Sequence, residues 1–316
     1  MESLFLQVIR ANYWQRTIFN LGIYHLMNHY TISDLEKFTG IMAGTIRIWE
    51  RRYQIIKPHR TDTNRRWYDN DDLKRILNIS ILYRKGIRIS KIATFSEAEI
   101  DEKVILLTRE SSDTETLFDS LIVAMSDLDE DRINDLLMRS IINKGFEETF
   151  TGVVFPFLRR VGIMWHTGSV DIGSEHFVSN IFKKRLIAAI DTLSPPEHRD
   201  RKKFIMFLPE SELHEIGLLF FTYMIRKTGH SVLYLGQSTP FNCLKELVEQ
   251  WHPDFLVTGA LTNLPFGRPE DYLKHISSVF RDQTIFVAGI LAPYAGKMSL
   301  NNVVPFDSVN SLKKYL

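Results

Sequence analysis

The stretch TIRIWERRYQIIKPHRTDTNRRWYDNDDL, residues 45–73, decides the fold of the amino-terminal part of the chain. Its beginning predicts a helix, because apolar side chains recur at three- and four-residue spacing and therefore share one face. The side chains on that face are Ile46, Trp49 and Tyr53. Polar and basic side chains occupy the other faces, namely Thr45, Arg47, Arg51 and Arg52. The sequence thus predicts a basic helix with one buried face.

A β hairpin is predicted directly after this helix. Lys57 and Pro58 end the helix, and a turn over residues 62–64 follows. Trp67 and Tyr68 are typical strand residues that would anchor the hairpin. Three arginines surround its turn, namely Arg60, Arg65 and Arg66. Arginines at a hairpin tip can reach phosphates or a narrow minor groove, so the pattern predicts a DNA-binding wing.

A shorter helix is predicted upstream of the basic one. Ser33 and Glu36 have the spacing of a capping box with Ser33 as the N-cap, and Gly40 ends the helix. Two short helices joined by a tight glycine turn, the second rich in arginine, indicate a helix-turn-helix. A further helix is expected from about residue 70 to Leu82, ended near Gly86.

The charge of the chain is divided unevenly along its length. The whole chain has a formal net charge of +1, but residues 27–96 contain 14 Lys and Arg against 7 Asp and Glu. This segment is therefore basic, and the remainder after residue 96 is acidic. A basic segment is the electrostatic footprint of nucleic-acid binding, although charge alone is equally consistent with a solvated basic face. The motifs favour nucleic acid.

This segment resembles a known DNA-binding domain. The runs YTIS (30–33), TIRIWERRY (45–53), RRWY (65–68) and DDL (71–73) resemble MerR-type transcription regulators, and the WERRY form resembles the branch whose effector domain binds cobalamin. The resemblance implies dimers that bind inverted repeats. It implies the following DNA-binding residues: Thr45, Arg47 and Arg51 in the major groove, with Arg60, Arg65, Arg66 and Tyr68 in the wing.

The rest of the chain divides into a helical part and an α/β part. Four amphipathic segments between about residues 113 and 193 predict an antiparallel four-helix bundle, in which Pro156 should kink or split the third helix. Residues 202–316 alternate strand and helix, which predicts a doubly wound parallel sheet. The predicted strands are 203–208, 231–235, 255–258 and 284–288, and the predicted helices are 214–227 and 240–250, the latter with Thr239 as N-cap.

A histidine motif falls at the carboxyl edge of this sheet, where doubly wound folds bind ligands. Glu212, His214 and Gly217 occupy the loop and helix start after the first strand. Glu212 can accept a hydrogen bond from one ring nitrogen and direct the other toward a metal. A lone histidine in such a loop is more often a surface residue. The E-x-H-x-x-G spacing favours a ligand.

This spacing resembles the D/E-x-H-x-x-G signature of Rossmann-like domains that bind cobalamin with histidine as lower cobalt ligand, which implies that role for His214. Trp165 and the pair Glu175-His176 resemble the W-x9-E-H pattern of CarH/LitR-like photoreceptor regulators, and the resemblance implies that they cover the upper face of adenosylcobalamin. Otherwise Trp165 fills a bundle core and the pair is helix surface.

The chain departs from this family near the nucleotide tail of the cofactor. Such domains carry Ser or Thr after the third strand, for which Thr258 and Thr262 are the candidates. They carry Gly-Gly after the fourth strand, where this chain has only Gly289. This departure supports the alternative of a regulator that keeps the fold, works without a cofactor and responds through a protein partner.

The predicted function is a DNA-binding transcription regulator, acting as a repressor, that senses adenosylcobalamin and light. The resemblance implies that the cofactor drives tetramer formation in the dark and that light releases the DNA. The chain is not expected to be an enzyme: a cobalamin-dependent methyltransferase or mutase needs a barrel of roughly 250 residues, which does not fit beside the other domains.

Composition limits the setting and the domain boundaries. Cys243 is the single cysteine, so an intramolecular disulfide and a cysteine zinc site are excluded and a cytoplasmic location is expected. No apolar run approaches the roughly 20 residues of a membrane helix. The predicted domains are an extension (1–26), a winged helix-turn-helix (27–96), a linker (97–112), a four-helix bundle cap (113–197) and a Rossmann-like cobalamin-binding domain (198–316).

Overall fold

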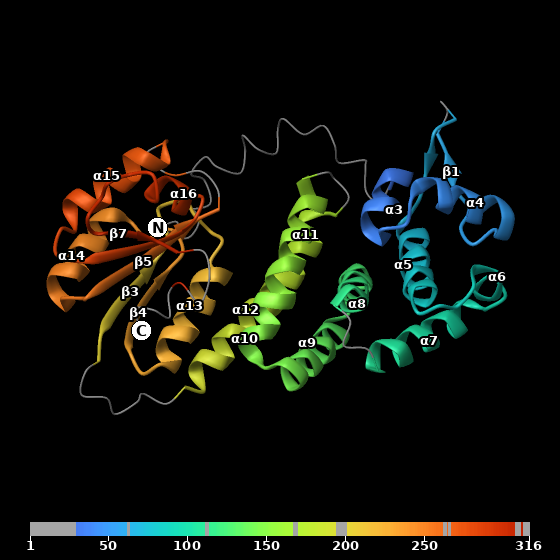
Figure 1. Ribbon diagram of the computed structural model, residues 1–316, viewed down its shortest axis with the longest axis horizontal. Helices are drawn as coiled ribbons and strands as arrows, with labels where there is room; N and C mark the ends of the chain where they lie inside the picture. The colour runs from blue at the N-terminus through green and yellow to red at the C-terminus, as the bar shows by residue number, and fades with distance from the viewer. Residues whose placement is uncertain are drawn as a thin grey trace, which may run out of the picture. The chain divides into compact units, whose positions relative to one another are not determined.

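A computed structural model of the protein describes residues 30–61, 64–110, 114–166, 170–193, 201–261, 264, 267–306 and 311. The predicted extension over residues 1–26 lies outside them. The chain divides into two compact units, Met1–Val178 and Ser179–Leu316. Their elements are labelled in Figure 1.

The first unit begins with the predicted winged helix-turn-helix, which is confirmed. Its elements are α3 (Ile32–Thr39), α4 (Ala43–Tyr53), β1 (His59–Arg60), β2 (Arg66–Trp67), α5 (Asn70–Arg84) and α6 (Ile89–Ile92). The two wing strands pair antiparallel, with Arg60 opposite Arg66. Of the side chains predicted to share the buried face of α4, Ile46 and Trp49 are buried and Tyr53 is partly buried. Leu35 and Phe38 of α3 are buried as well.

The predicted cap of α3 was wrong by two residues. Thr31, not Ser33, is the N-cap: the Thr31 side chain accepts from the amide of Asp34, whose carboxylate accepts from the Thr31 amide at 2.8 Å. The reason lies in the preceding residue. Tyr30 forms a β bridge with Tyr68, so the chain is extended up to Thr31 and the helix begins at Ile32.

A helical region follows, and the boundary between the two units falls within its last helix, after Val178. Its elements are α7 (Glu97–Glu110), α8 (Thr114–Ser126), α9 (Glu130–Lys144), α10 (Phe146–Thr149), the π turn η1 (Phe150–Val154), α11 (Phe155–His166) and α12 (Ile172–Asp191). The four predicted bundle segments correspond to α8, α9, the run α10–η1–α11, and α12. The third is split as predicted. Pro156 has no amide to offer a carbonyl one turn back, and the wider π turn lies just before it.

The second unit contains a five-stranded sheet with the order β4-β3-β5-β6-β7. All neighbouring strands are parallel, as predicted. The strands are β3 (Lys203–Phe207), β4 (Ser231–Gly236), β5 (Phe255–Ala260), β6 (Thr284–Gly289) and β7 (Val303–Pro305), of which β7 was not predicted. The connections from β3 and β5 leave toward opposite edges, so the topological switch point lies between these two strands.

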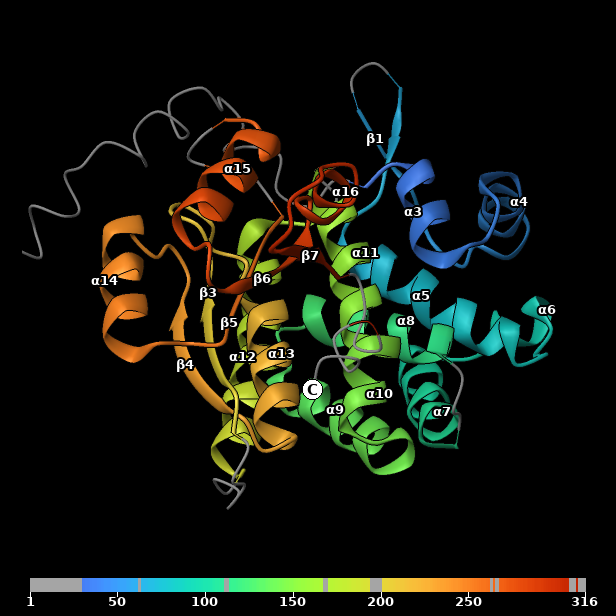
Figure 2. The same ribbon diagram turned by 60° about the vertical axis from the view of Figure 1, so that its left-hand side comes forward.

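Helices cover both faces of this sheet. α13 (Ile216–Lys227) packs on one face through Leu218 and Ile225. α14 (Phe241–Trp251), α15 (Pro269–Val279) and α16 (Ala292–Ala295) pack on the other, as Figure 2 shows. The helix of the second unit that was predicted to be capped by Thr239 instead has Pro240 as N-cap. Thr239 is buried and donates to the Gly236 carbonyl at 3.4 Å.

Across the described ranges, no helix combines the length and the hydropathy that crossing a bilayer requires.

Candidate nucleic-acid interface and ligand-binding edge

The exposed face of α4 and the wing enclose an open depression of about 500 Å³. Among its lining residues are four cations, Arg47, Arg51, Lys57 and Arg66, and one acid, Glu50. Arg47 and Arg51 are exposed, as the basic helix predicted. A concave surface with this excess of positive charge suits a phosphate backbone.

Glu50 joins the helix to the wing, a role that the sequence did not suggest. Its Oε1 accepts from Arg66 Nε at 3.2 Å, and its Oε2 accepts from the Tyr68 hydroxyl at 3.0 Å. Burial, with Glu50 adding to it, raises the pKa of Tyr68, which therefore stays protonated and donates. Glu50 is the single acid in residues 43–61, and that isolation was the available signal.

Tyr68 was predicted to contact DNA, and its burial argues against this. The side chain is fully buried, so it has no surface to present to a duplex. Tyr68 lies at the base of the wing and is bonded to α4 through Glu50, so it is part of the support that orients the wing.

The wing arginines differ in how they are held. Arg60 Nη1 donates to Asn64 Oδ1 at 2.6 Å, which keeps this guanidinium against the turn. Arg65 is exposed. The turn residues 62 and 63 lie outside the described part of the chain.

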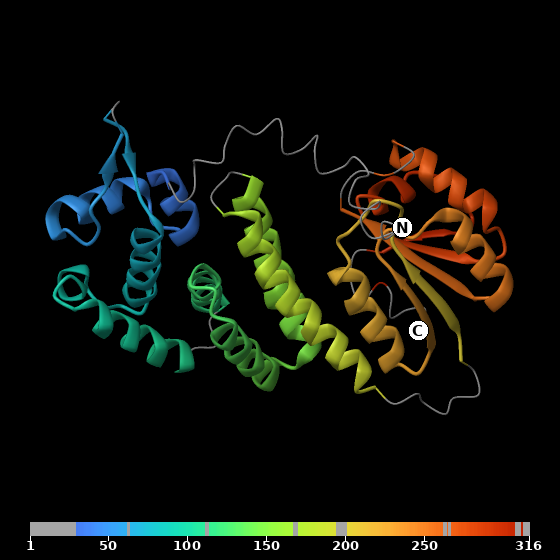
Figure 3. The same cartoon turned by 180° about the vertical axis from the view of Figure 1, so that it is seen from behind.

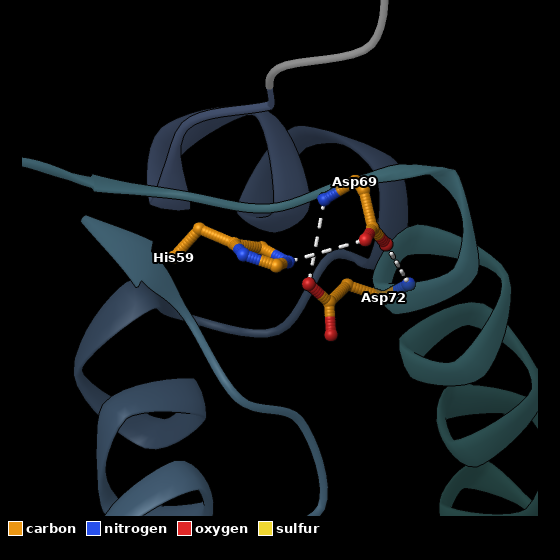
Figure 4. A group of neighbouring side chains, drawn as sticks. All are labelled: His59, Asp69 and Asp72. Carbon is orange, nitrogen blue, oxygen red and sulfur yellow. Dashed lines mark hydrogen bonds and ion pairs between the residues drawn. The ribbon is translucent and has the colours of Figure 1, made fainter. Parts of the chain in front are cut away.

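A histidine and two aspartates connect the wing to α5, as Figure 4 shows. His59 Nε2 lies 3.2 Å from Asp69 Oδ2, and the His59 ring stacks on Trp67. Asp69 and Asp72 form the capping box of α5, since Asp69 Oδ1 accepts from the Asp72 amide at 2.9 Å and Asp72 Oδ2 accepts from the Asp69 amide at 3.3 Å. The carboxylates are thereby engaged in starting the helix that supports the wing.

The histidine motif lies at the switch point of the second unit. His214 was predicted to begin the helix, but α13 starts at Ile216 and His214 belongs to the loop after β3. Glu212 is fully buried, and its Oε1 lies 2.6 Å from His214 Nδ1 and accepts from the His214 amide at 3.0 Å. Its Oε2 accepts from the amide of Leu261, directly after β5, at 2.7 Å. One carboxylate therefore ties together the loops on both sides of the switch point.

This arrangement fits a metal-binding histidine. Because Nδ1 of His214 faces the Glu212 carboxylate, a metal held by His214 would be bound through Nε2. The His214 side chain is 52% exposed, which leaves it accessible from the sheet edge. Beside it, a Cβ added at Gly217 would meet no atom within 4 Å, so there is open space at the start of α13.

A second acid beside His214 was missed. Glu215 is buried, its Oε2 accepts from the Tyr234 hydroxyl at 2.6 Å, and its Oε1 pairs with Lys183 of α12. Burial, followed by this hydrogen bond, raises the pKa of Tyr234. The helix α12 is thus tied to the loop that carries His214. No local pattern indicated this pairing, because Lys183 lies far upstream in the sequence.

The remaining predicted residues of this edge are placed as follows. Thr258 is buried in β5, and Thr262 lies outside the described residues. Gly289 has a φ of +67°, and a Cβ there would lie 2.1 Å from the Ala260 carbonyl oxygen. The close approach of β5 and β6 is therefore sufficient to require glycine at this position.

Trp165, Glu175 and His176 come from the adjoining ends of two consecutive helices, α11 and α12, which Figure 3 shows from behind. Trp165 is the residue before the last of α11, and the acid–histidine pair lies near the start of α12. His176 Nδ1 lies 2.6 Å from Glu175 Oε2. Trp165 is 41% exposed, so it does not merely fill a core.

Comparisons with known proteins define the class to which these features point. Residues 30–99 match the family model described as MerR HTH family regulatory protein, and residues 117–189 match that of the B12 binding domain. The chain therefore joins a MerR-type helix-turn-helix domain to a B12-binding domain.

Particular relatives share this combination over most of the chain. The HTH-type transcriptional repressor CarH of Myxococcus xanthus is 28% identical over 270 residues, which cover 83% of this chain and 89% of CarH. The repressor CarA of the same organism is 25% identical over 252 residues, covering 79% and 82%. Among solved structures, the Methanosarcina barkeri monomethylamine corrinoid protein aligns with a TM-score of 0.49 at 12% identity, covering 65% of this chain and 99% of that chain. The chain is homologous to the CarH and CarA repressors.

Proposed function

We propose that this protein is a DNA-binding transcription regulator that senses cobalamin. The observation that carries the proposal is the buried Glu212 carboxylate, which orients His214 at the switch point of a chain whose other end is a helix-turn-helix. Burying a carboxylate is costly unless it is hydrogen-bonded, and Glu212 accepts from the amides of His214 and Leu261. The same carboxylate faces the His214 ring, so it can orient a metal-binding histidine.

At the ligand-binding edge, each residue has a definite task. Bound cobalamin would supply a cobalt ion that accepts a nitrogen ligand, and His214 would hold it. Glu212 faces His214 Nδ1 and directs Nε2 outward. Glu215, anchored by Lys183 and Tyr234, holds the end of the loop where α13 begins. The open space beside Gly217 gives a bulky ligand room to approach.

At the nucleic-acid interface, Thr45, Arg47 and Arg51 are the residues of α4 proposed to read base edges in the major groove. The wing arginines, Arg60, Arg65 and Arg66, bind phosphates and hold the register. Glu50 belongs to α4 and accepts hydrogen bonds from Arg66 and Tyr68 of the wing, so it fixes the angle between these two groups.

Further parts of the proposal concern the form of the cofactor and the response. Adenosylcobalamin is the proposed form of the cofactor, and Trp165, Glu175 and His176 are the residues proposed to cover it. Light is the proposed signal that displaces these residues from the cofactor. The protein acts in the cytoplasm as a repressor without enzymatic activity of its own. It binds DNA as a dimer or tetramer. The resemblance of the W-x9-E-H spacing and the homology to two repressors support these points.

A cofactor-independent regulator is the second candidate. The single Gly289 favours it, because the close approach to Ala260 explains this glycine without any ligand. Such a protein would keep the fold and respond through a protein partner.

Uptake of the cofactor separates the two candidates. Purified protein is mixed with adenosylcobalamin in the dark, passed through a desalting column and examined by absorption spectroscopy. The wild-type protein should retain the cofactor and His214→Ala should retain less, with an altered spectrum. His252→Asn, an exposed histidine of the same unit at a left-handed position that asparagine tolerates, is the control and should behave like wild type. No retention by the wild-type protein would favour the cofactor-independent regulator.

A further inference from the structure

The carboxyl end of α3, the first helix of the helix-turn-helix, is hydrogen-bonded by two arginine side chains from other helices. The last four carbonyls of a helix lack partners within it. Here the Glu36 carbonyl accepts from the Gly40 amide at 2.8 Å, and the Thr39 carbonyl accepts from Arg84 Nη1 at 3.0 Å. Arg160 Nη2 donates to the carbonyls of Lys37, at 3.3 Å, and Phe38. Two guanidinium groups thus complete the end of this helix.

The two arginines come from different parts of the unit. Arg84 ends α5 within the helix-turn-helix domain, whereas Arg160 belongs to α11, which is 122 residues away from Phe38 in the sequence. A positive charge at a helix carboxyl terminus is favourable because it opposes the helix dipole. The helical region therefore supplies one of the residues that stabilise the DNA-reading domain.

One helix holds both arginines. Arg160 Nη1 donates to Glu115 Oε2 at 3.4 Å, and Arg84 Nη2 donates to Asp119 Oδ2. Glu115 and Asp119 are four residues apart on α8, so they lie on one face of that helix. α8 thus presents two carboxylates to the two guanidinium groups that hold α3.

The two halves of this arrangement differ in strength. Asp119 is fully buried and also accepts from the Ser80 hydroxyl at 3.0 Å, so removing Arg84 would leave a buried carboxylate without its counterion. The Glu115 side chain is 59% exposed, and ion pairs of this kind contribute little. Arg84 is therefore the fixed holder of α3 and Arg160 the releasable one.

We propose that Arg160 is a positioning residue for DNA binding, through which the helical region controls the placement of α3. The proposal rests on the proposed function, since it assumes a regulated DNA-binding domain. Trp165 lies on the same helix as Arg160, one to two turns further along, so a displacement of α11 at its Trp165 end changes the reach of the Arg160 guanidinium. Loss of its two bonds would leave the Lys37 and Phe38 carbonyls to water and loosen the end of α3.

Hydrogen exchange of the full-length protein, without DNA or cofactor, tests the contact itself. In Arg160→Met, the amides of α3 and its following turn, residues 35–41, should exchange at least about threefold faster than in the wild-type protein, because the end of the helix opens more often. Arg159→Met is the matched control: Arg159 is exposed on the same helix and should leave the exchange unchanged. Unchanged exchange in Arg160→Met would overturn the proposal, whether or not the protein binds DNA.

The regulatory part is tested on duplexes that the wild-type protein enriches from a random DNA pool. Dissociation constants are measured by fluorescence anisotropy with and without adenosylcobalamin in the dark. Coupled sites commonly change affinity by about 5- to 150-fold, and Arg160→Met should reduce the wild-type ratio to below about twofold. Arg160→Lys should give an intermediate ratio, because an ammonium has one nitrogen where the guanidinium uses Nη2 for the carbonyls and Nη1 for Glu115. A wild-type ratio retained in Arg160→Met would contradict the proposal, whereas failure of the wild-type protein to enrich any duplex would instead contradict the proposed function.

Discussion

At the sheet edge, single residues orient the histidine predicted to bind a ligand and determine how closely the strands and loops approach. Glu212 is buried, yet it bonds the loop after β3 and the loop after β5 at once. Gly289 occupies a backbone position that a larger residue cannot take. His214 could be selected from the sequence because the E-x-H-x-x-G spacing is local. Its partner at Leu261 could not, because that amide is brought close only by the order of the strands.

The two glycines of this edge, Gly289 and Gly217, should differ in how substitution by alanine affects the free energy of unfolding. A Cβ at Gly289 would lie 2.1 Å from the Ala260 carbonyl oxygen at a φ of +67°, so the strands must separate. Gly289→Ala should lower the free energy of unfolding by about 2 kcal/mol or more, as strained positions and overpacking do. Gly217→Ala meets no atom within 4 Å. Urea titration of the cofactor-free variants should show Gly217→Ala as stable as wild type.

The variants Gly217→Ala and Gly289→Ala also distinguish a glycine needed for protein packing from one needed for ligand binding. If the space beside Gly217 receives cobalamin, Gly217→Ala should bind adenosylcobalamin more weakly than wild type while folding normally. Equal affinity in that variant would show that the space serves no ligand. A Gly289→Ala variant with wild-type stability would contradict the described approach of β5 and β6.

At the scale of elements, the sequence determined which segments form helices and strands better than where they begin. The periodicity of residues 45–53 and the apolar strands of the sheet predicted their elements correctly. Ser33 and Thr239 were wrongly chosen as N-caps, because Tyr30 and Pro240 decide where those helices begin. The edge strand β7 has only three residues and too little pattern to be recognised.

Contacts between elements could not be predicted from local sequence patterns. Glu215 and Arg160 each bond partners far away in the sequence, and nothing in their immediate neighbourhood distinguishes them from surface charges. Glu50 is set apart only by being the single acid of a basic segment, which does not indicate its partners. The predicted site residues were therefore mostly those that resemble a known motif. The residues that hold the predicted ones in place emerged from the fold.

The helix α4 and the wing should contribute differently to DNA binding. Arg47→Ala removes a group predicted to read bases, so it should weaken the free energy of binding to the preferred duplex by about 1–3 kcal/mol. It should also reduce the difference in affinity between the preferred duplex and other duplexes. Arg65→Ala removes an exposed wing charge and should weaken all duplexes similarly, lowering the slope of log affinity against log salt by about one. Anisotropy titrations at several salt concentrations measure both effects. The assignment of α4 to the major groove would fail if Arg47→Ala changed only the salt slope.

At the scale of the whole molecule, the near-neutral net charge is an average over two parts. A basic DNA-reading domain is joined to an acidic remainder that contains the B12-binding domain. The homology to two repressors extends over both parts, so the combination, rather than either domain, is what the chain shares with them. Regulation requires that cobalamin binding to the acidic part changes the affinity of the basic part for DNA. This coupling is the central claim.

The dependence of DNA affinity on cobalamin tests this claim most directly. Affinity of the full-length protein for its enriched duplex is measured in the dark with and without adenosylcobalamin, in the wild-type protein and in His214→Ala. The wild-type affinity should change by about fivefold or more, within the usual range of coupling between sites, and the change should disappear in His214→Ala. A protein that retains cobalamin and binds DNA with the same affinity in its presence and absence would contradict the account.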